Sequence, residues 1–493
     1  MIFEFDNYEV AEITDMWGQI HLAKDIKLIT TNNAMKWLKF GVSFDYWANW
    51  VRKNNCMFGI VKTSHASKFG EVQRTSYQMI NSLALDTMPE VVSYSVEYIN
   101  KLKTDDEVFL QYLRDNSNFS NDYEVLVALV EHNPDFKYSS YFRQRKASII
   151  GSYILKFKTG KTMQNADNLT IVGSPYAMLL HSVGESIYSD PTFKIEDGCI
   201  QVWTSRFKDG EYLAEFRNPF NSRNNLGYVH NVKHEYFDKY FNFGNLIIAV
   251  NMIGTDFQDR NNGSDQDSDS CYTTNQMDIV RHAKYCYKNY PTIVNNIPPE
   301  KISYDNTMDN FAKVDNSLAA AQLAIGESSN LAQLCLTYTY NFDNKIFYDY
   351  VCILSVIAQV AIDNAKRKYD IDLPNEIGYI KKMIDIGEKK YPKFWLITKQ
   401  DKRKFRTDEL REKRRKENYN KILKQVNEDL KCPMNFLYDY KFSYYRDGKK
   451  TIPIENFFEP QVIPKNRRKS KQVEKLIEKY SIEIGRASCR ERV

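Results

Sequence analysis

Three aspartates at alternate positions, Asp265, Asp267 and Asp269, stand out in the stretch DRNNGSDQDSDSCYTTNQ at residues 259–276. Small polar residues surround them, and no basic residue lies within four positions on either side. In a tight loop the three carboxylates can converge, and they then repel one another by several kcal/mol at intermediate dielectric. Such a cluster requires a cation, and its oxygen ligands suit Mg²⁺ or Ca²⁺.

An EF-hand calcium loop is the first alternative for this stretch. That loop needs a glycine at position six and a glutamate at position twelve. Counted from Asp265, these positions hold Ser270 and Gln276, and strand-like segments precede the loop. The EF-hand is therefore excluded, whereas a solvated acidic loop and a Ca²⁺-binding or carbohydrate-binding β-domain stay open.

Magnesium bound by carboxylates together with substrate phosphates is the other possibility, as in nucleotidyl transfer. Such a site also needs cations that neutralise a triphosphate. The sequence offers Arg217 and Arg223 in EFRNPFNSRNNLG, and Lys62 and Lys68 in VKTSHASK. Taken alone, each of these four residues is better explained as an ordinary surface charge.

The segment from about 146 to 275 has the residue pattern of a β-domain. Short β-branched and aromatic runs alternate with Gly, Asn and Asp turns, which is typical of a compact barrel or sandwich. The predicted strands lie within 152–160, 169–173, 199–207, 212–219 and 245–254. By this prediction the aspartates follow the last strand.

Helices are expected on both sides of the β-domain. Residues 84–145 contain several helical segments, and residues 71–83 are also typical of a helix. Downstream, residues 314–340 form an Ala- and Leu-rich pattern with Gly326 near its middle, and residues 347–370 form a largely apolar one. The charged stretch 401–418 is interpreted as a solvated helix face, with a nucleic-acid contact as the alternative.

The bulk composition narrows the class of protein. A chain of 493 residues with 43% hydrophobic residues is expected to form two to four structural units. We find no apolar run of roughly 18–20 residues, and the first residues lack a signal-peptide pattern. The eight cysteines include no CxxC pair, which disfavours a zinc site and favours reduced cytosolic thiols.

The C-terminal residues 484–493, IGRASCRERV, back-translate into a common sequencing-library adapter. We interpret this segment as an adapter-encoded artefact rather than a natural basic tail. It is therefore excluded from the structural predictions. The natural protein is expected to continue beyond Glu483.

Four stretches, in this order, resemble the two-barrel RNA polymerase superfamily. They are VKTSHASK with the following QRTSYQMINSL, then RNPF, then GSDQDSD, and finally GESSNLAQL with LSVIAQVAIDNAK. More narrowly, the chain resembles the single-chain branch of RNA-silencing RNA-dependent RNA polymerases and related phage and prophage RNA polymerases. The resemblance covers roughly residues 50 to 376, and the aspartate loop is its most specific part.

The resemblance implies a role for each matched residue. Asp265, Asp267 and Asp269 would hold the catalytic Mg²⁺. Lys62 and Lys68 would contact the incoming nucleotide or the RNA end, and Arg217 would approach the nucleotide. Asp363 and Lys366 fall in the downstream helices near the active centre.

One position departs from the family's pattern. The family has a glycine between its last two aspartates, whereas this chain has Ser268. Glycine tolerates any backbone angle, while serine disfavours a positive φ but is small enough to fit. The departure bears on activity more than on fold.

The resemblance further implies an α+β fold with a double-psi β-barrel core. The expected domains are part of a first barrel with the lysine loop at 1–83, a helical connector at 84–145, a second barrel with the aspartate loop at 146–290, helices near the active centre at 291–400, a basic helical tail at 401–483, and the artefact at 484–493.

The implied function is template-directed RNA polymerisation by two-metal nucleotidyl transfer of nucleoside triphosphates onto an RNA 3′ end. The expected partners are a nucleic-acid template, the RNA product and nucleoside triphosphates, with Mg²⁺ as cofactor and no membrane. The expected location is the cytoplasm of a bacterial or phage-infected cell. A nucleic-acid-binding barrel that has lost its chemistry is the alternative.

Overall fold

The computed structural model describes residues 7, 9–15, 18–26, 42–57, 66–67, 70–218, 221–300, 307–364, 369–384, 386–399, 408–457, 471–472 and 475. The chain divides into two units. The first comprises Met1–Asp115 with Ile150–Tyr445, and the second comprises Asn116–Ile149 with Arg446–Val493. All of the site residues discussed below belong to the first unit.

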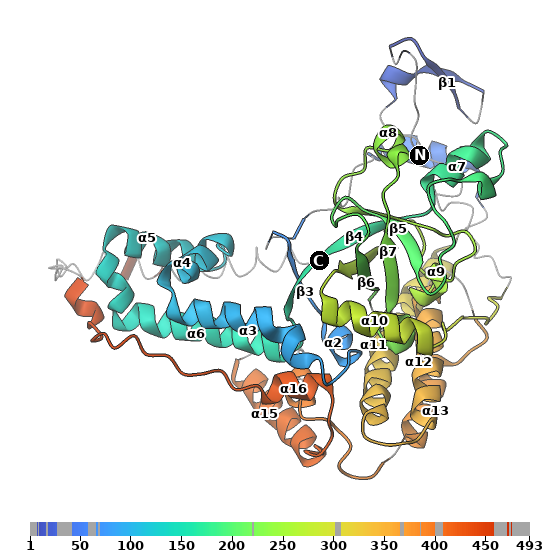
Figure 1. Ribbon diagram of the computed structural model, residues 1–493. Coiled ribbons are helices and arrows are strands. Elements are labelled where there is room, and N and C mark those ends of the chain that lie inside the picture. Colours follow the sequence, from blue (N-terminus) through green and yellow to red (C-terminus); the bar gives the residue numbers. More distant parts are fainter. Residues whose placement is uncertain are drawn as a thin grey trace. The chain divides into compact units, whose positions relative to one another are not determined.

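A closed six-stranded β-barrel lies at the centre of the first unit (Figure 1). Around the ring, the strands are β4 (Met163–Val172), β8 (Ile247–Val250), β5 (Ile200–Trp203), β7 (Gly227–Asn231), β6 (Tyr212–Phe216) and β9 (Ser270–Thr274). The pairing of β9 with β4 closes the ring. The pairs β4–β8 and β5–β7 are parallel, and the other four are antiparallel.

Strand alternation gives the barrel an apolar interior. Successive side chains of a strand point to opposite faces, so every second residue faces inward. The buried core cluster comprises Leu169, Ile171, Ile200, Val202, Phe207, Leu213, Val229, Ile248, Val250, Phe257 and Cys271. Tyr212, Tyr228 and His230 alternate with core residues and therefore lie on the outer face.

These strands confirm the α+β fold and correct two details of the expected strand order. Four predicted strand segments each overlap an observed strand, but residues 152–158 lie in helix α6 (Ser140–Lys158). Buried Ile150, Tyr153 and Phe157 recur at three- and four-residue spacing, which is helical and not alternating. Strands β7 and β9 were not predicted, because both are polar in composition.

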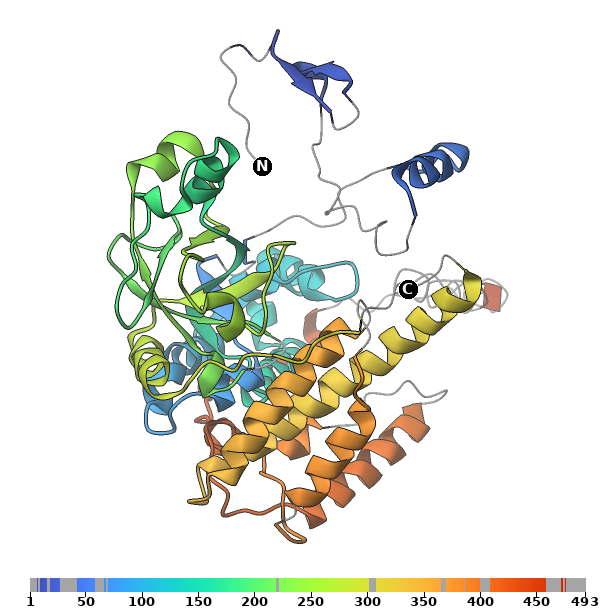
Figure 2. The same cartoon turned by 90° about the vertical axis from the view of Figure 1, so that its right-hand side faces the viewer.

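Long helices surround the barrel. Helix α10 (Met277–Asn289) packs on the outer side of β6 and β7. Helices α11 (Met308–Thr339) and α12 (Ile346–Asp363) pack side by side (Figure 2), and α13 (Leu373–Met383) contacts both. The two long downstream helices expected from the sequence are thus present.

Helix α12 has the length and apolar composition of a membrane span, the one such helix in the described ranges. The sequence pattern alone did not reveal it, because Asp349 and Asp363 interrupt the apolar residues. Its most apolar 18-residue window is 56% buried by the rest of the chain. Buried core helices of globular proteins meet the same criteria.

The remaining elements are short or lie outside the barrel. The helices are α1 (Phe44–Lys53), α2 (Tyr77–Asn81), α3 (Met88–Thr104), α4 (Asp106–Asp115), α5 (Tyr123–His132), α7 (Pro175–Ser182), α8 (Glu235–Tyr240), α9 (Phe257–Arg260), α14 (Trp395–Thr398), α15 (Asp408–Lys424) and α16 (Pro433–Asp439). The 3-10 turns are η1 (Ala23–Asp25), η3 (Pro134–Tyr138), η4 (Ile187–Ser189), η5 (Arg223–Asn225) and η6 (Ile454–Phe457). A hairpin joins β1 (Glu12–Thr14) to β2 (Ile20–Leu22).

Two further predictions can be compared with these elements. Residues 71–83 were expected to be one helix, but β3 (Val72–Arg74) pairs with the start of β4 before α2 begins. The Ser76 hydroxyl accepts a hydrogen bond from the Met79 backbone N–H, which caps α2 and separates it from the strand. Of the charged stretch 401–418, residues 401–407 lie outside the described residues. Helix α15, which holds the rest, is largely exposed, as a solvated face requires.

Candidate functional site

The three aspartates lie in the loop that joins α9 to β9. They therefore precede the strand that closes the barrel, whereas the sequence had placed them after the last strand. The backbone carbonyl of Asp269 accepts a hydrogen bond of 2.9 Å from the Ile171 N–H on β4. This bond fixes the end of the loop against the barrel wall.

Local contacts hold the rest of the loop in one conformation. The N–H groups of Gly263 and Ser264 both donate to the Gln258 carbonyl, at 2.8 and 3.1 Å. Farther along, the Gln266 side-chain oxygen accepts from the Gly173 N–H at 3.0 Å. A Cβ atom on Gly173 would lie only 2.7 Å from the Gln266 amide nitrogen, so glycine allows this close approach.

The aspartate side chains converge, as the sequence predicted. One carboxylate oxygen from each of Asp265, Asp267 and Asp269 lies within 4.8 Å of the other two. Asp265 and Asp267 are exposed, and Asp269 is half-buried. Asp269 Oδ2 accepts the Asp265 N–H at 2.9 Å, and Asp265 Oδ1 accepts the Asp267 N–H at 3.3 Å. The loop therefore directs its own carboxylates toward one point.

The backbone explains why the resembled family has glycine where this chain has Ser268. Ser268 adopts a φ of 102°, a region that L-residues with a side chain rarely occupy. The serine thus keeps the conformation that brings Asp267 and Asp269 together, at a cost in backbone strain. The departure from glycine leaves the convergence of the carboxylates intact.

Arg217 follows β6 directly and lies against the loop. Its Nη2 donates to Asp269 Oδ2 at 2.6 Å, and its Nη1 donates to the Asn261 carbonyl at 3.0 Å. The pair is largely shielded, because the two side chains are 14% and 23% exposed. Arg217 therefore compensates part of the negative charge and also supports the loop backbone.

A cavity of about 460 Å³ opens in front of the carboxylates. Its lining also includes Asn295, Asn296, Ile297 and Pro299, then Gln359, Ile362 and Asp363 at the end of α12, and Tyr369. Asp363, which the resemblance placed near the active centre, and Asp259 add two further carboxylates to the cavity lining. The Gln359 Nε2 atom is buried and has no hydrogen-bond partner among the described residues.

A buried polar network supports the loop from below. Glu215 on β6 is 1% exposed and accepts a hydrogen bond of 2.9 Å from the Asn261 side chain. Burial raises the pKa of Glu215 to about 7, although the hydrogen bond from Asn261 opposes the shift. The Asn225 amide donates to Asn262 Oδ1 at 2.9 Å. The sequence did not single out these residues, although Glu215 interrupts an apolar strand.

The other candidate cations are not part of this cavity as described. Lys62, Lys68 and Lys366 lie outside the described residues. Arg223 lies elsewhere, 4.4 Å from the Tyr340 ring centroid, and it donates to the Tyr290 hydroxyl at 3.2 Å. Arg223 is therefore half-buried among aromatic rings and does not lie beside the aspartates.

The chemistry of the donor set fits a hard divalent cation. All three converging groups are carboxylates, and such oxygen ligands suit Mg²⁺. Two of them are exposed toward the cavity, where phosphate oxygens and water could complete the coordination. Asp265, Asp267 and Asp269 could therefore hold Mg²⁺.

No protein-family model and no curated protein sequence matches the chain. Among solved structures, the chain is similar to the RNA-dependent RNA polymerase QDE-1 from Thielavia terrestris, with 12% sequence identity and a TM-score of 0.44. The similarity covers 73% of this chain and 38% of that polymerase. The chain thus spans well under half the length of that protein.

Proposed function

We propose that this protein is a template-directed RNA polymerase that transfers nucleotides from nucleoside triphosphates onto an RNA 3′ end. One observation carries the proposal. Three carboxylates converge within 4.8 Å at the edge of a closed barrel, and an arginine and an open cavity lie beside them. Their order along the chain also matches the polymerase motifs that the sequence resembles.

The reaction requires little covalent chemistry from the protein. The RNA 3′-hydroxyl attacks the α-phosphate, a new phosphodiester bond forms, and the bond to pyrophosphate breaks. Mg²⁺ bound by the three aspartates would supply Lewis-acid stabilisation of the phosphoryl oxygens and lower the pKa of the attacking hydroxyl. The chain itself contributes mainly positioning and electrostatics.

Arg217 has two tasks in this proposal. Through Asp269 it holds one carboxylate in place before any ligand arrives, so the site is preorganised. Its charge also offsets the negative charge that a triphosphate brings into a cavity already lined by five carboxylates. Lys62 and Lys68 are proposed to contribute further positive charge at the triphosphate or the RNA end.

The α12 side of the cavity is suited to orienting the substrate. Gln359 offers a buried amide N–H without a hydrogen-bond partner among the described residues. A ligand oxygen that accepts a hydrogen bond from this group removes its desolvation penalty and so favours binding. A ribose hydroxyl or a base oxygen has the matching chemistry. A cavity of about 460 Å³ is also of the size that small-molecule sites occupy.

The test is RNA synthesis by the full chain with Mg²⁺, four nucleoside triphosphates and single-stranded RNA or DNA templates. We expect product from the wild type and none from the Asp265→Ala/Asp267→Ala/Asp269→Ala variant. The template that yields more product would identify the template class. A matched control is Asp259→Ala, which removes a carboxylate from the same cavity wall but not from the converging group.

Two outcomes would overturn the proposal. Product that persists in the triple variant would show that the aspartates do not hold the catalytic metal. A folded wild type that binds template but makes no product would favour the inactive nucleic-acid-binding barrel. Tight Ca²⁺ binding without nucleotide, and no template binding, would instead favour a calcium module.

A further inference from the structure

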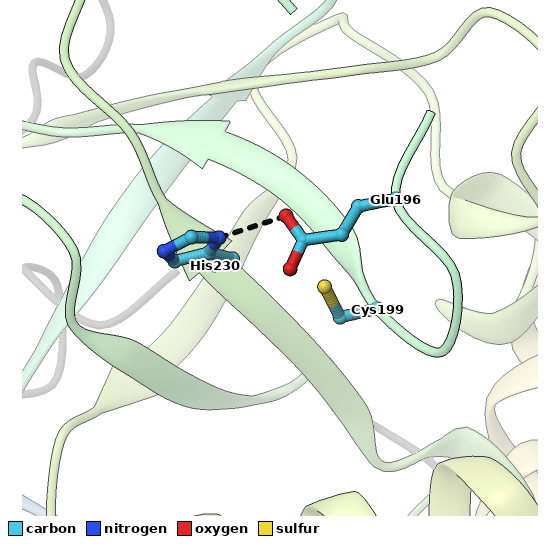
Figure 3. A group of neighbouring side chains, drawn as sticks. All are labelled: Glu196, Cys199 and His230. Atoms are coloured by element: carbon cyan, nitrogen blue, oxygen red, sulfur yellow. Dashed lines mark hydrogen bonds and ion pairs between the residues drawn. The ribbon is translucent and has the colours of Figure 1, made fainter. Parts of the chain in front are cut away.

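A second polar cluster lies on the outer face of the barrel, away from the aspartate loop. It consists of Glu196, Cys199 and His230 (Figure 3). Glu196 and Cys199 form a backbone bridge across a tight turn that precedes β5, and Gly198 in that turn has a φ of 78°. His230 lies on β7, where it is opposite Gln201 on one side and Tyr212 on the other. Strand pairing therefore fixes all three positions.

The three side chains point toward one another. One oxygen of Glu196, the Cys199 Sγ and one ring nitrogen of His230 all lie within 4.8 Å of one another. Glu196 Oε2 is 2.8 Å from His230 Nδ1, and it also accepts from the Gln201 amide at 3.0 Å. The His230 ring stacks on Tyr212 with centroids 4.4 Å apart. These contacts hold the three side chains together before any ion binds.

We propose that Glu196, Cys199 and His230 form a zinc-binding site. Thiolate, imidazole and carboxylate together are the ligand types of Zn²⁺, whereas Mg²⁺ takes oxygen ligands alone. A thiolate and a carboxylate carry two negative charges, which one Zn²⁺ neutralises. The zinc ion together with its three ligands therefore carries no net charge. This neutrality favours a position against the barrel wall, where Cys199 is only 5% exposed.

Zinc binding at this cluster has to release one proton, because the ligand form of cysteine is the thiolate. Burial raises the pKa of the Cys199 thiol to about 12, and the Glu196 carboxylate adds to the shift. Burial also raises the pKa of Glu196, but hydrogen bonds from His230 and Gln201 outweigh it and lower this pKa to about 2. The carboxylate is therefore ready as a ligand, and Zn²⁺ must displace the proton of the thiol.

The fourth coordination position has access to water. Glu196, Cys199 and Gln201 line one side of a cavity of about 640 Å³. A tetrahedral zinc ion with three protein ligands has one position left, and here a water molecule from that cavity can occupy it. The site would tie the Glu196–Cys199 turn to β7 and so stabilise the barrel wall. This inference is independent of the proposed polymerase function.

The competing explanation is a cluster that is complete without a metal. The hydrogen bond between Glu196 and His230 already satisfies both groups, and Zn²⁺ has to replace it. A metal-free cluster predicts no thiolate bond to a cation. The experiment below separates the two explanations.

The test uses the full chain after removal of metal by a chelator, titrated with Co²⁺ as a spectroscopic substitute for Zn²⁺. We expect one equivalent of Co²⁺ to give a thiolate-to-cobalt charge-transfer band in the near ultraviolet, and Zn²⁺ to abolish the band. Cys199→Ser and His230→Gln should each weaken binding by roughly tenfold or more, since even residues that only orient a ligand contribute about 10–100-fold.

Two controls locate the signal. Cys56→Ser removes an exposed thiol outside the cluster and should leave the band unchanged. The triple alanine variant of the aspartate loop should also keep the band, because carboxylates give no thiolate transition. Loss of the band in either control would place the ion elsewhere and overturn the proposal.

A measurement on the wild type guards against variants that fail to fold. X-ray absorption at the zinc edge should show one sulfur and otherwise nitrogen or oxygen neighbours in the zinc-loaded chain. The midpoint of thermal unfolding should rise with Zn²⁺ concentration. A coordination shell without sulfur, or no Co²⁺ band at all, would overturn the proposal.

Discussion

The barrel carries two groups of converging polar side chains that differ in their internal charge balance. In the aspartate loop, three carboxylates of the same sign meet, and Arg217 compensates mainly Asp269. In the outer cluster, Glu196 and His230 already form a hydrogen-bonded pair beside a buried thiol. Binding of a divalent cation relieves the repulsion between the aspartates. In the outer cluster, an ion binds only if its bonds to the ligands are stronger than the hydrogen bond between Glu196 and His230.

The difference also appears in ligand chemistry and in mechanical support. The aspartates lie on a loop with a strained serine, and two of them face a cavity. Glu196, Cys199 and His230 are held by strand pairing on the barrel wall. A loop with hard oxygen ligands suits an ion that is exchanged with substrate, and a rigid mixed set suits an ion that stays bound.

The largest expected effect comes from removing the middle aspartate. Asp267→Ala should lower RNA synthesis by about 10²–10³-fold or more, because the metal then loses a direct ligand. Its main-chain contacts remain, so the thermal unfolding midpoint should stay close to that of the wild type. Mn²⁺ binding followed by electron paramagnetic resonance provides a readout that does not depend on activity.

The matched control for this variant is Asp363→Ala, which removes the cavity-lining carboxylate at the end of α12. It should keep Mn²⁺ binding to the loop. RNA synthesis by Asp267→Ala at the wild-type rate would contradict the assignment of the metal site.

The next effect in size concerns the charge that balances the loop. Arg217→Ala should lower RNA synthesis by about 10–10²-fold, because Asp269 loses its orienting hydrogen bond and the triphosphate loses a cation. The affinity for Mn²⁺ should not fall, since more negative charge is left uncompensated. Arg217→Lys keeps the charge but cannot donate to both Asp269 and the Asn261 carbonyl in the geometry of a guanidinium, so it should restore only part of the rate.

A loss of Mn²⁺ binding in Arg217→Ala would show a different role for this residue. It would mean that Arg217 serves only to hold the loop, through its bond to the Asn261 carbonyl. Metal binding and synthesis, measured on the same variant, therefore distinguish the two roles.

A smaller effect on stability is expected at Glu215. Burial raises its folded-state pKa to about 7, above the value of an unfolded glutamate. Between these two pKa values the folded state binds more protons than the unfolded state, so stability falls as pH rises through this window. Glu215→Gln should remove this loss, on the order of 1–3 kcal/mol between about pH 5 and about pH 8.

Urea unfolding of the wild type and of Glu215→Gln at both pH values measures this effect. Glu185→Gln, at an exposed position, is the control and should follow the wild type. Equal pH dependence in all three proteins would mean that Glu215 is ionised in the folded state.

The smallest effect is expected at the strained position of the loop. Ser268→Gly should stabilise the protein by about 1 kcal/mol, because glycine adopts a φ of 102° without strain. RNA synthesis should stay the same or increase. The control is Ser270→Gly at the start of β9, where glycine should destabilise, and denaturant unfolding compares the two. A destabilised Ser268→Gly would show that the serine side chain has a role of its own.

Part of the fold follows from residue patterns that act over short distances. The apolar runs that became β4, β5, β6 and β8 alternate or are short and β-rich, so local propensity and pattern agree. The helices α11 and α12 follow from long apolar segments. Residues 152–158 were assigned wrongly because a β-branched and aromatic run can also form a buried helix face.

Other features depend on contacts between distant parts of the chain. Strands β7 and β9 are too polar to be identified alone, and pairing with β6 from both sides makes them part of the barrel. The Arg217–Asp269 pair joins residues 52 positions apart in the sequence. Nothing local predicts which arginine makes this contact, and Arg223 packs against Tyr340 instead.

The acidic triad follows from the sequence alone, because three alternating aspartates without nearby bases repel one another unless a loop and a cation hold them together. The tertiary structure decided the rest of the site. Closure of the barrel brought Arg217 and the loop together, and the packing of α12 supplied the cavity-lining residues Gln359 and Asp363. It also assembled Glu196, Cys199 and His230, because strand register, and not spacing along the chain, decides which side chains face one another.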